Sequence, residues 1–408
     1  MKRQIFVCVA CVASIGLVHA QSSVTLYGQV DGNVAYVNNA QSAATSKSGR
    51  PVGGSIISLL DNGASSLSSS RWGLKGIEDL GSGVKAIFNL ENGFNMNNGT
   101  FQNGGALFGR LAFVGLSSDL GTLKLGRQGD TSVDYVSPLT YGWEGGNLAI
   151  HPADYDDLVF SRHLNNTVKY NSPTYAGFQY GALYSFGGVA GNFTQNQVWS
   201  VGARYSGGVV SLAVSYVNAR NPNFSFYGTN PSSSATGLNM GSPGSATSPE
   251  SNASIAGFAG ARTQQTITSA ATLSLGGAIL GLAYSHAEFS NLDSNPSLNT
   301  FHYTGSTGMS SYEGSARYYI TPVLIVGGSY TYTYGGDVAN KGSATYQQMN
   351  CSLMYLLSKT TSVFLSAAYQ HASGTDSFGR PAVAAIGYLT ASTTNKQVAA
   401  SLGLKHSF

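Results

Sequence analysis

The chain has 408 residues and a net charge of +3, and only 10% of its residues are charged, compared with roughly 25% in a typical soluble domain. Its mean hydropathy is −0.02 and it has no apolar run of about 18 residues, which excludes helical membrane spans. The 52 Gly, 24 Tyr and 18 Phe, together with two-residue alternation, favour a transmembrane β-barrel over a secreted β-sandwich. So balanced a charge predicts no nucleic-acid partner.

The first twenty residues have the pattern of a cleaved secretory signal peptide. Lys2 and Arg3 form a basic start, an apolar stretch follows, and Ala20 ends a small-residue cleavage site. Two domains are therefore expected: the signal peptide at 1–20 and one barrel at 21–408. Cleavage removes two positive charges, which lowers the net charge from +3 to +1. Because Cys351 is then the single remaining cysteine, no internal disulfide can form.

The remaining chain reads as pairs of alternating strands, joined by tight turns at one end and long polar loops at the other. This asymmetry is typical of an outer-membrane barrel, and sixteen strands allow the sheet to close with both chain ends on one side. The loop at 219–261 is the longest and is expected to be the most mobile. The predicted strands lie at 24–33, 71–75, 84–91, 110–116, 122–128, 166–171, 178–186, 198–205, 209–218, 264–274, 278–289, 312–320, 323–334, 346–357, 361–371 and 396–408.

The stretch from Arg110 to about Glu144 organises this pattern. It begins with two short alternating runs around a turn, which predict a β-hairpin. The residues that follow have no clear period, and a long irregular segment in a regular chain is usually functional or disordered. We expect this loop to fold into the barrel and to narrow a water-filled pore.

The last strand indicates how the barrel closes. One of its faces is largely apolar and the other polar, and an open edge in lipid would leave several backbone groups unpaired. It must therefore pair with the first strand. The terminal Phe408 is either a signal for insertion into the membrane or simply an aromatic residue of the interfacial girdle.

Six short motifs stand out along the chain after the signal peptide. They are Val24-Thr25-Leu26-Tyr27-Gly28, Arg71-Trp72-Gly73-Leu74-Lys75-Gly76, Leu90-Glu91-Asn92-Gly93-Phe94, Arg110-Leu111-Ala112-Phe113-Val114-Gly115-Leu116, Leu125-Gly126-Arg127-Gln128 and Lys405-His406-Ser407-Phe408. These motifs resemble those of the trimeric general diffusion porins of Gram-negative outer membranes, and the resemblance covers the chain after the signal peptide. It implies a sixteen-stranded antiparallel barrel with an inward-folded third loop, a homotrimer, and passive diffusion of small hydrophilic solutes and ions. It also implies contact with outer-membrane lipid, lipopolysaccharide and the barrel-assembly machinery.

The resemblance also implies a pore constriction between a basic wall and an acidic loop. Opposed charges across a narrow gap produce a transverse field that weakly selects ions. Gln29 stands where enteric relatives carry a further cation, so the sign of the selectivity stays open, and any one of these charges could be a solvated lumen residue. The expected wall cations are Arg71, Arg110, Arg162, Lys75 and Lys124, and the expected loop acids are Asp130, Asp134 and Glu144.

Arg127 is unusual because it has the parity of the outward residues Leu123 and Leu125. A cation on the lipid face at mid-membrane costs roughly 2–4 kcal/mol. Either a bulge rotates it inward or it lies at a subunit interface. We favour the trimer interface.

Two alternative functions are weighed against general diffusion. An enzyme would need a histidine beside a nucleophile, and His286 next to Ser285 or His371 near Ser373 are weak candidates without a nucleophile elbow. No catalytic residue, cofactor or metal site is expected. A substrate-specific channel for a saccharide or an organic anion is the closer alternative, and saturation of flux by one solute would distinguish it.

Overall fold

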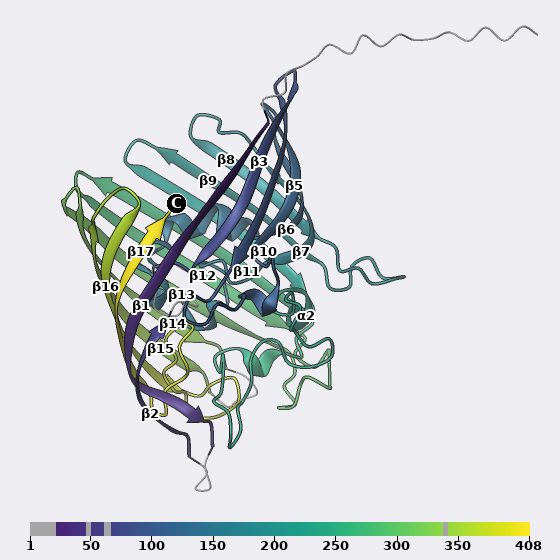
Figure 1. Ribbon diagram of the computed structural model, residues 1–408. Coiled ribbons are helices and arrows are strands. Elements are labelled where there is room, and N and C mark those ends of the chain that lie inside the picture. Colours follow the sequence, from purple (N-terminus) through teal and green to yellow (C-terminus); the bar gives the residue numbers. More distant parts are fainter. Residues whose placement is uncertain (1–21, 46–49, 61–66, 338–341) are drawn as a thin grey trace, which may run out of the picture.

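The computed structural model describes residues 22–45, 50–60, 67–337 and 342–408, and the predicted signal peptide lies outside these ranges. It forms one antiparallel sheet of 17 strands that closes into a barrel (Figure 1). Among these residues no helix is long and apolar enough to cross a membrane. The strands are β1 (Ser23–Ala43), β2 (Val52–Leu60), β3 (Arg71–Gly81), β4 (Val84–Gly93), β5 (Leu111–Ser118), β6 (Gly121–Gln128), β7 (Leu164–Asn171), β8 (Phe178–Ser185), β9 (Val198–Gly207), β10 (Val210–Arg220), β11 (Thr263–Leu275), β12 (Ala278–Ser290), β13 (Ser306–Thr321), β14 (Leu324–Gly335), β15 (Ala344–Leu356), β16 (Thr361–Gly374) and β17 (Lys396–Ser407).

Two of these strands share one position in the wall. The part of β1 from Asn33 onward pairs with β2, whereas its first part, up to Gln29, pairs with β3. The seventeen strands therefore occupy sixteen positions, which confirms the predicted sixteen-stranded antiparallel barrel. The predicted first strand, 24–33, is too short, and β2 falls in a stretch that was expected to be a loop.

The barrel closes between its first and last strands, as the alternation in the last strand predicts. Gln29 pairs with Ser407, and the register continues to Val37 and Ala399. The backbones of Gly28 and Phe408 exchange two hydrogen bonds of 3.0 Å. A Cβ at Gly28 would lie 2.6 Å from the Phe408 ring, so glycine allows this ring to lie on the outer face. The role of Phe408 in membrane insertion stays a prediction.

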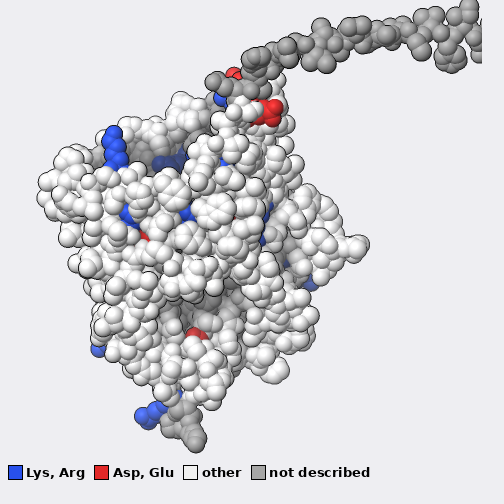
Figure 2. Space-filling model, viewed as in Figure 1, with Lys and Arg blue, Asp and Glu red and all other residues white. Residues whose placement is uncertain are grey.

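Alternation places apolar side chains outward along each strand. On β17, Leu402 is 59% exposed and Leu404 51%, whereas Ser401 is 2% exposed and Gln397 is buried. Most of the surface in view in Figure 2 carries neither a basic nor an acidic side chain. This outward apolar band suits lipid, and the polar inner face can be hydrated.

The segment between β6 and β7, which we call the central loop (129–163), enters the barrel as short helical turns. Thr131 bonds Ser215 at 2.7 Å and Tyr155 bonds Ser285 at 2.7 Å, so the loop contacts inward side chains of β10 and β12. Val136, Leu139 and Leu158 pack on inward alanines of the wall. The turns are η2 (Ser132–Val136), η3 (Ser137–Leu139), α1 (Tyr141–Gly145), η4 (Asn147–Ala149) and η5 (Pro152–Asp154).

The long loop between β10 and β11 packs an apolar core that includes Phe226, Met240, Ile255 and Phe258. That it is the most mobile part of the chain stays a prediction. It contains α2 (Pro222–Ser225) and η6 (Ala256–Phe258). Ser377, in the loop between β16 and β17, donates a 2.7 Å hydrogen bond to the Ala253 carbonyl. These two loops therefore form a connected cap at the lower end of the barrel in Figure 1.

Candidate functional site

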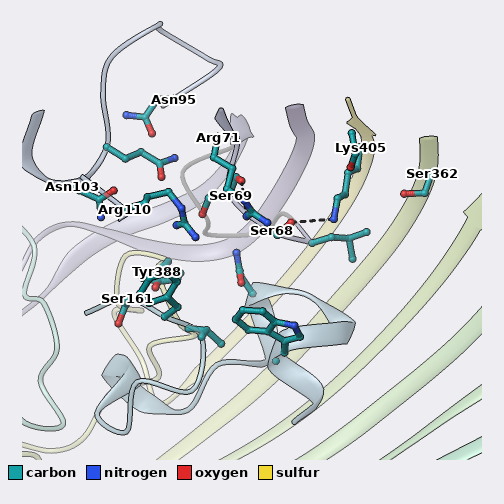
Figure 3. A pocket seen from close by; sticks show the side chains of 18 of the residues that line it. Ser68, Ser69, Arg71, Asn95, Asn103, Arg110, Ser161, Ser362, Tyr388 and Lys405 are labelled. Carbon is teal, nitrogen blue, oxygen red and sulfur yellow. Dashed lines mark hydrogen bonds between the residues drawn. The ribbon is translucent and has the colours of Figure 1, made fainter. Parts of the chain in front are cut away.

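A cavity of ≈ 670 Å³ lies between the central loop and the wall formed by β3 and β15 to β17. Its lining combines basic side chains with serine, threonine and asparagine. No aspartate or glutamate is found among the described residues that line it. Figure 3 shows Arg71, Arg110 and Lys405 around this cavity, with Tyr388 and Ser161 across from them. The cations of the lining are Arg71, Arg110, Arg162, Lys359 and Lys405.

Arg71 begins β3, directly after the interruption between β2 and β3. Leu67, Ser68 and Ser69 of that interruption also line the cavity, so this part of the chain lies on the lumen side of the wall. The Ser68 amide donates a 2.9 Å hydrogen bond to Oδ2 of Asp31, and Lys405 Nζ donates to the Ser68 hydroxyl at 3.2 Å. Asp31 and Lys405 are direct cross-strand partners. These contacts fix the segment before Arg71.

Glu91 on β4 holds the first two arginines. Its Oε1 accepts a 2.7 Å hydrogen bond from Nε of Arg110, and its Oε2 lies 3.7 Å from Nε of Arg71. Tyr27 donates a further 2.8 Å hydrogen bond to Oε2. Glu91 is only 5% exposed. The Glu91 carboxylate, which is not part of the cavity lining, thus positions both guanidinium groups. The sequence analysis did not predict this role.

Arg162 reaches the cavity from the end of the central loop. Its Nη2 donates to the Ala153 carbonyl at 3.1 Å, and its guanidinium lies 4.3 Å from the centre of the Tyr227 ring. Burial lowers the pKa of Arg162, but Tyr227, Asp154 and Asp157 raise it above the usual arginine value. The group therefore stays charged. Arg162 also borders a second cavity of ≈ 350 Å³ beneath the cap.

Two predicted wall cations do not line the main cavity. Lys75 lies 5.2 Å from the centre of the Tyr27 ring, and Lys124 lines a separate cavity with Asp134 and Phe113. Of the five predicted wall cations, the three arginines line the main cavity and the two lysines do not. Lys359 and Lys405 were not among the predicted wall cations.

Two of the predicted loop acids do not face the arginines. Asp130 is fully buried and accepts the Ser132 amide at 2.7 Å, and Asp134 pairs with Nζ of Lys169 at 2.5 Å. Both lie at the start of the central loop, where Lys169 of β7 contacts them, and neither lines the main cavity. Glu144 belongs to α1, but its side chain lies outside what the structure describes, so its role stays a prediction.

Arg127 lies at a bulge, where Gly126 has φ 137° and the pairing with β7 shifts register. Its guanidinium donates to the Gly109 carbonyl at 2.7 Å, to the Thr229 carbonyl at 2.9 Å and to Oδ1 of Asn230 at 2.8 Å. It therefore joins three segments of its own chain. Its proposed place in a trimer interface stays a prediction.

One of the two parts of the central loop that line the cavity, 141–151, is anchored at both ends to one wall carboxylate. Oε1 of Glu313 accepts the Tyr141 amide at 2.9 Å, and its Oε2 lies 3.7 Å from Nε2 of His151. The other ring nitrogen of His151 lies 2.6 Å from Oδ2 of Asp156. Burial lowers the pKa of His151, but Asp156 and Glu313 raise it to about 10. The imidazole is therefore charged between two carboxylates.

The two histidines considered as enzyme candidates contact other side chains than the serines near them in the sequence. His286 contacts the Ser310 hydroxyl at 2.8 Å, while Ser285 bonds Tyr155 instead. His371 lies 3.1 Å from the Asn395 amide. In the described part of the chain, no group of three or more histidine, cysteine or acidic side chains could hold a metal ion.

Comparisons with known proteins agree with this architecture. An outer membrane porin protein of Bordetella pertussis is 33% identical over 241 residues, which cover 54% of this chain and 61% of that protein. Outer membrane porin protein 32 of Delftia acidovorans is 36% identical over 224 residues, which cover 52% and 56% of the two chains. These matches thus span less than two thirds of either relative.

The solved structures and the family comparison extend over more of the chain. An anion-selective porin from Comamonas acidovorans has a TM-score of 0.65 at 21% identity, covering 95% of this chain and 100% of that one, which shows a shared fold. The family model described as Gram-negative porin matches residues 7–375. From this match and the closed barrel, we conclude that the chain belongs to the Gram-negative porin family and lies in the outer membrane.

Proposed function

We propose that the protein is a diffusion pore for small hydrophilic solutes and ions, with a preference for anions. The observation that carries this proposal is the lining of the main cavity, which combines five cations with no described carboxylate. A charged ring in a narrow aqueous path raises the local concentration of counter-ions. The anion selectivity named for the Comamonas acidovorans porin supports the same sign.

The preference rests on positioned arginines rather than on the net charge of the chain. Glu91 binds the two wall arginines at Nε, so it orients Arg71 and Arg110 without being part of the lining. At about 5 Å in a water-like dielectric, one unit charge is worth roughly 0.8 kcal/mol to a passing ion. This corresponds to roughly a fourfold change in the permeability ratio.

Reversal potentials under a salt gradient, measured in planar bilayers, test the proposal. We expect the sign of anion selectivity, a shift toward cations in Arg110→Gln, and a larger shift when Arg71→Gln is added. Lys75→Gln is the matched control, because Lys75 lies on the same strand as Arg71 but does not line the cavity. A cation-selective wild type, or equal shifts from Lys75→Gln and Arg110→Gln, would contradict the proposal.

We also infer a homotrimer with an outer surface that contacts lipid. The exposed apolar side chains of the outer face, such as Val24 and Leu26, support burial against lipid or a neighbouring subunit. The same recordings test the assembly, because three joined pores close in three equal steps at high voltage. Lipopolysaccharide and the barrel-assembly machinery remain predicted partners.

A further inference from the structure

Aromatic side chains line the main cavity alongside its cations. Trp143 and Phe160 come from the central loop, and Tyr388 comes from the loop between β16 and β17. Trp143 is 43% exposed and Tyr388 46%. Inorganic ions and their hydration water have no favourable interaction with such surfaces, because apolar area exposed to water carries a free-energy cost. This area indicates contact with a solute that has an apolar part.

The rings differ in how they are already engaged. The Phe160 ring centre lies 5.2 Å from the guanidinium of Arg110, so this ring already makes a cation–π contact. Tyr227, which does not line the cavity, makes the same kind of contact with Arg162 at 4.3 Å. Within the described residues, the rings of Trp143 and Tyr388 make no stacking contact with another aromatic ring. Because nearly half of each side chain is exposed, part of each ring can contact a solute.

Trp143 is held on a well-anchored segment. The helix that carries it begins at Tyr141, whose amide bonds Glu313 at 2.9 Å and whose hydroxyl lies 2.7 Å from the Ser352 hydroxyl. Leu148, after the helix, accepts a 2.7 Å hydrogen bond from Gln348. Since wall residues fix both sides of this segment, little ordering is needed when a solute meets the indole, which favours binding.

We propose that the cavity is a transient binding site for small aromatic carboxylates. The carboxylate meets the guanidinium groups of Arg71 and Arg110, which suit planar bidentate recognition, and the ring of the solute lies against Trp143. The inference rests on the proposed anion pore, because the same arginines serve both. A neutral saccharide would also use an aromatic surface, but five cations without a described carboxylate in the lining favour a solute with negative charge.

Benzoate and cyclohexanecarboxylate provide the test, because they share charge and approximate size but differ in aromaticity. Each is added to the protein in a planar bilayer, and the concentration that halves the chloride current is measured. Aromatic contacts are worth roughly 0.5–1.5 kcal/mol beyond burial, so benzoate should block at a concentration about two- to thirteenfold lower. Trp143→Leu should remove this difference, and Trp143→Phe should retain most of it.

Trp199→Leu is the matched control, because Trp199 packs on Tyr216 and is not part of the cavity lining. Equal block by the two acids, or an undiminished benzoate preference in Trp143→Leu, would overturn the inference. Either result would leave the anion preference intact, since that is read separately from the reversal potential in chloride. If Trp143→Leu forms no open pore, the comparison is made with Tyr388→Leu, in which the benzoate preference should also fall.

Discussion

The anchoring of the central loop at His151 predicts a pH-dependent pore. The protonated imidazole lies between Asp156, at 2.6 Å, and Glu313, at 3.7 Å, and Asp154 is a third acid nearby. Burial lowers the pKa of His151, but the carboxylates raise it to about 10. Because the folded pKa lies above the ordinary value of about 6.5, this stabilisation is fully present below pH 6.5 and is lost as the pH rises toward 10.

Asp156, the carboxylate partner of His151, gives the contact a different pH dependence. Although burial raises the pKa of Asp156, His151 lowers it below its usual value. A depressed carboxyl pKa gives stabilisation that is present above about pH 3.8 and is lost only at lower pH. Between pH 4 and 6.5 both groups are charged, so the loop is most firmly attached there.

His151→Gln removes the cation and leaves two buried carboxylates without it. Breaking a buried ion pair in this way costs roughly 3–5 kcal/mol, which would raise the detached fraction of this contact by at least about a hundredfold. The Tyr141 amide still bonds Glu313, so we expect a loosened loop rather than a released one. Single-channel recordings should show more current noise and brief closures in the variant at pH 6.

The wild-type protein should acquire the same noise between pH 6.5 and 10, whereas His151→Gln should change little over that range. His286→Gln is the control, since His286 contacts the Ser310 hydroxyl and not an acid pair. If His151→Gln were as quiet as the wild type at pH 6, or kept the wild-type pH dependence, the reasoning would be refuted.

Two further predictions concern the loops around the pore. Arg127→Leu removes the donors to Thr229 and Asn230, so limited proteolysis should cut the β10–β11 loop several-fold faster. An unchanged cleavage rate would contradict this, and unchanged trimer stability in the same variant would remove the interface role. Phe258→Ala creates a cavity in the buried cap and should cost roughly 3–5 kcal/mol of local stability, seen as faster amide exchange. Phe193→Ala, at a 69% exposed side chain, is its control and should leave exchange in the cap unchanged.

The barrel itself was predictable because strand alternation and turn chemistry are local properties. β2 was missed because its sequence, from Val52 to Leu60, has two glycines and no strict alternation. It becomes a strand by pairing with the long second part of β1, which is a tertiary effect. The packed core of the β10–β11 loop was missed for a related reason, since its apolar residues are scattered among serine, asparagine and proline.

The sequence predicted the site residues that a motif places on or next to a strand. It did not predict the positions of residues that depend on how a loop folds. Arg71 and Arg110 stand in regular strand-edge motifs, and both line the cavity. Asp134 could not be placed from the sequence, because its partner Lys169 is brought to it only by the fold. One feature of the sequence could have predicted the contact between Glu91 and the two arginines. Glu91 is an inward acid on β4, and it lies directly opposite Gly73 on the strand that begins with Arg71.

We expect the selectivity of the proposed pore to depend on how its charges are paired and not on how many charges the chain carries. A chain whose net charge is close to zero can still present a strongly basic path if its acids are neutralised away from that path. Four lumen and loop acids each lie within 2.7 Å of a basic partner, whereas Arg71 is 3.7 Å from Glu91 and Lys405 donates to a serine. Because a close ion pair contributes little net field at a distance, we expect the lining cations outside these pairs, Arg71 and Lys405 among them, to set the sign of the selectivity. The paired acids are Glu91 with Arg110, Asp134 with Lys169, Asp156 with His151 and Glu250 with Arg380.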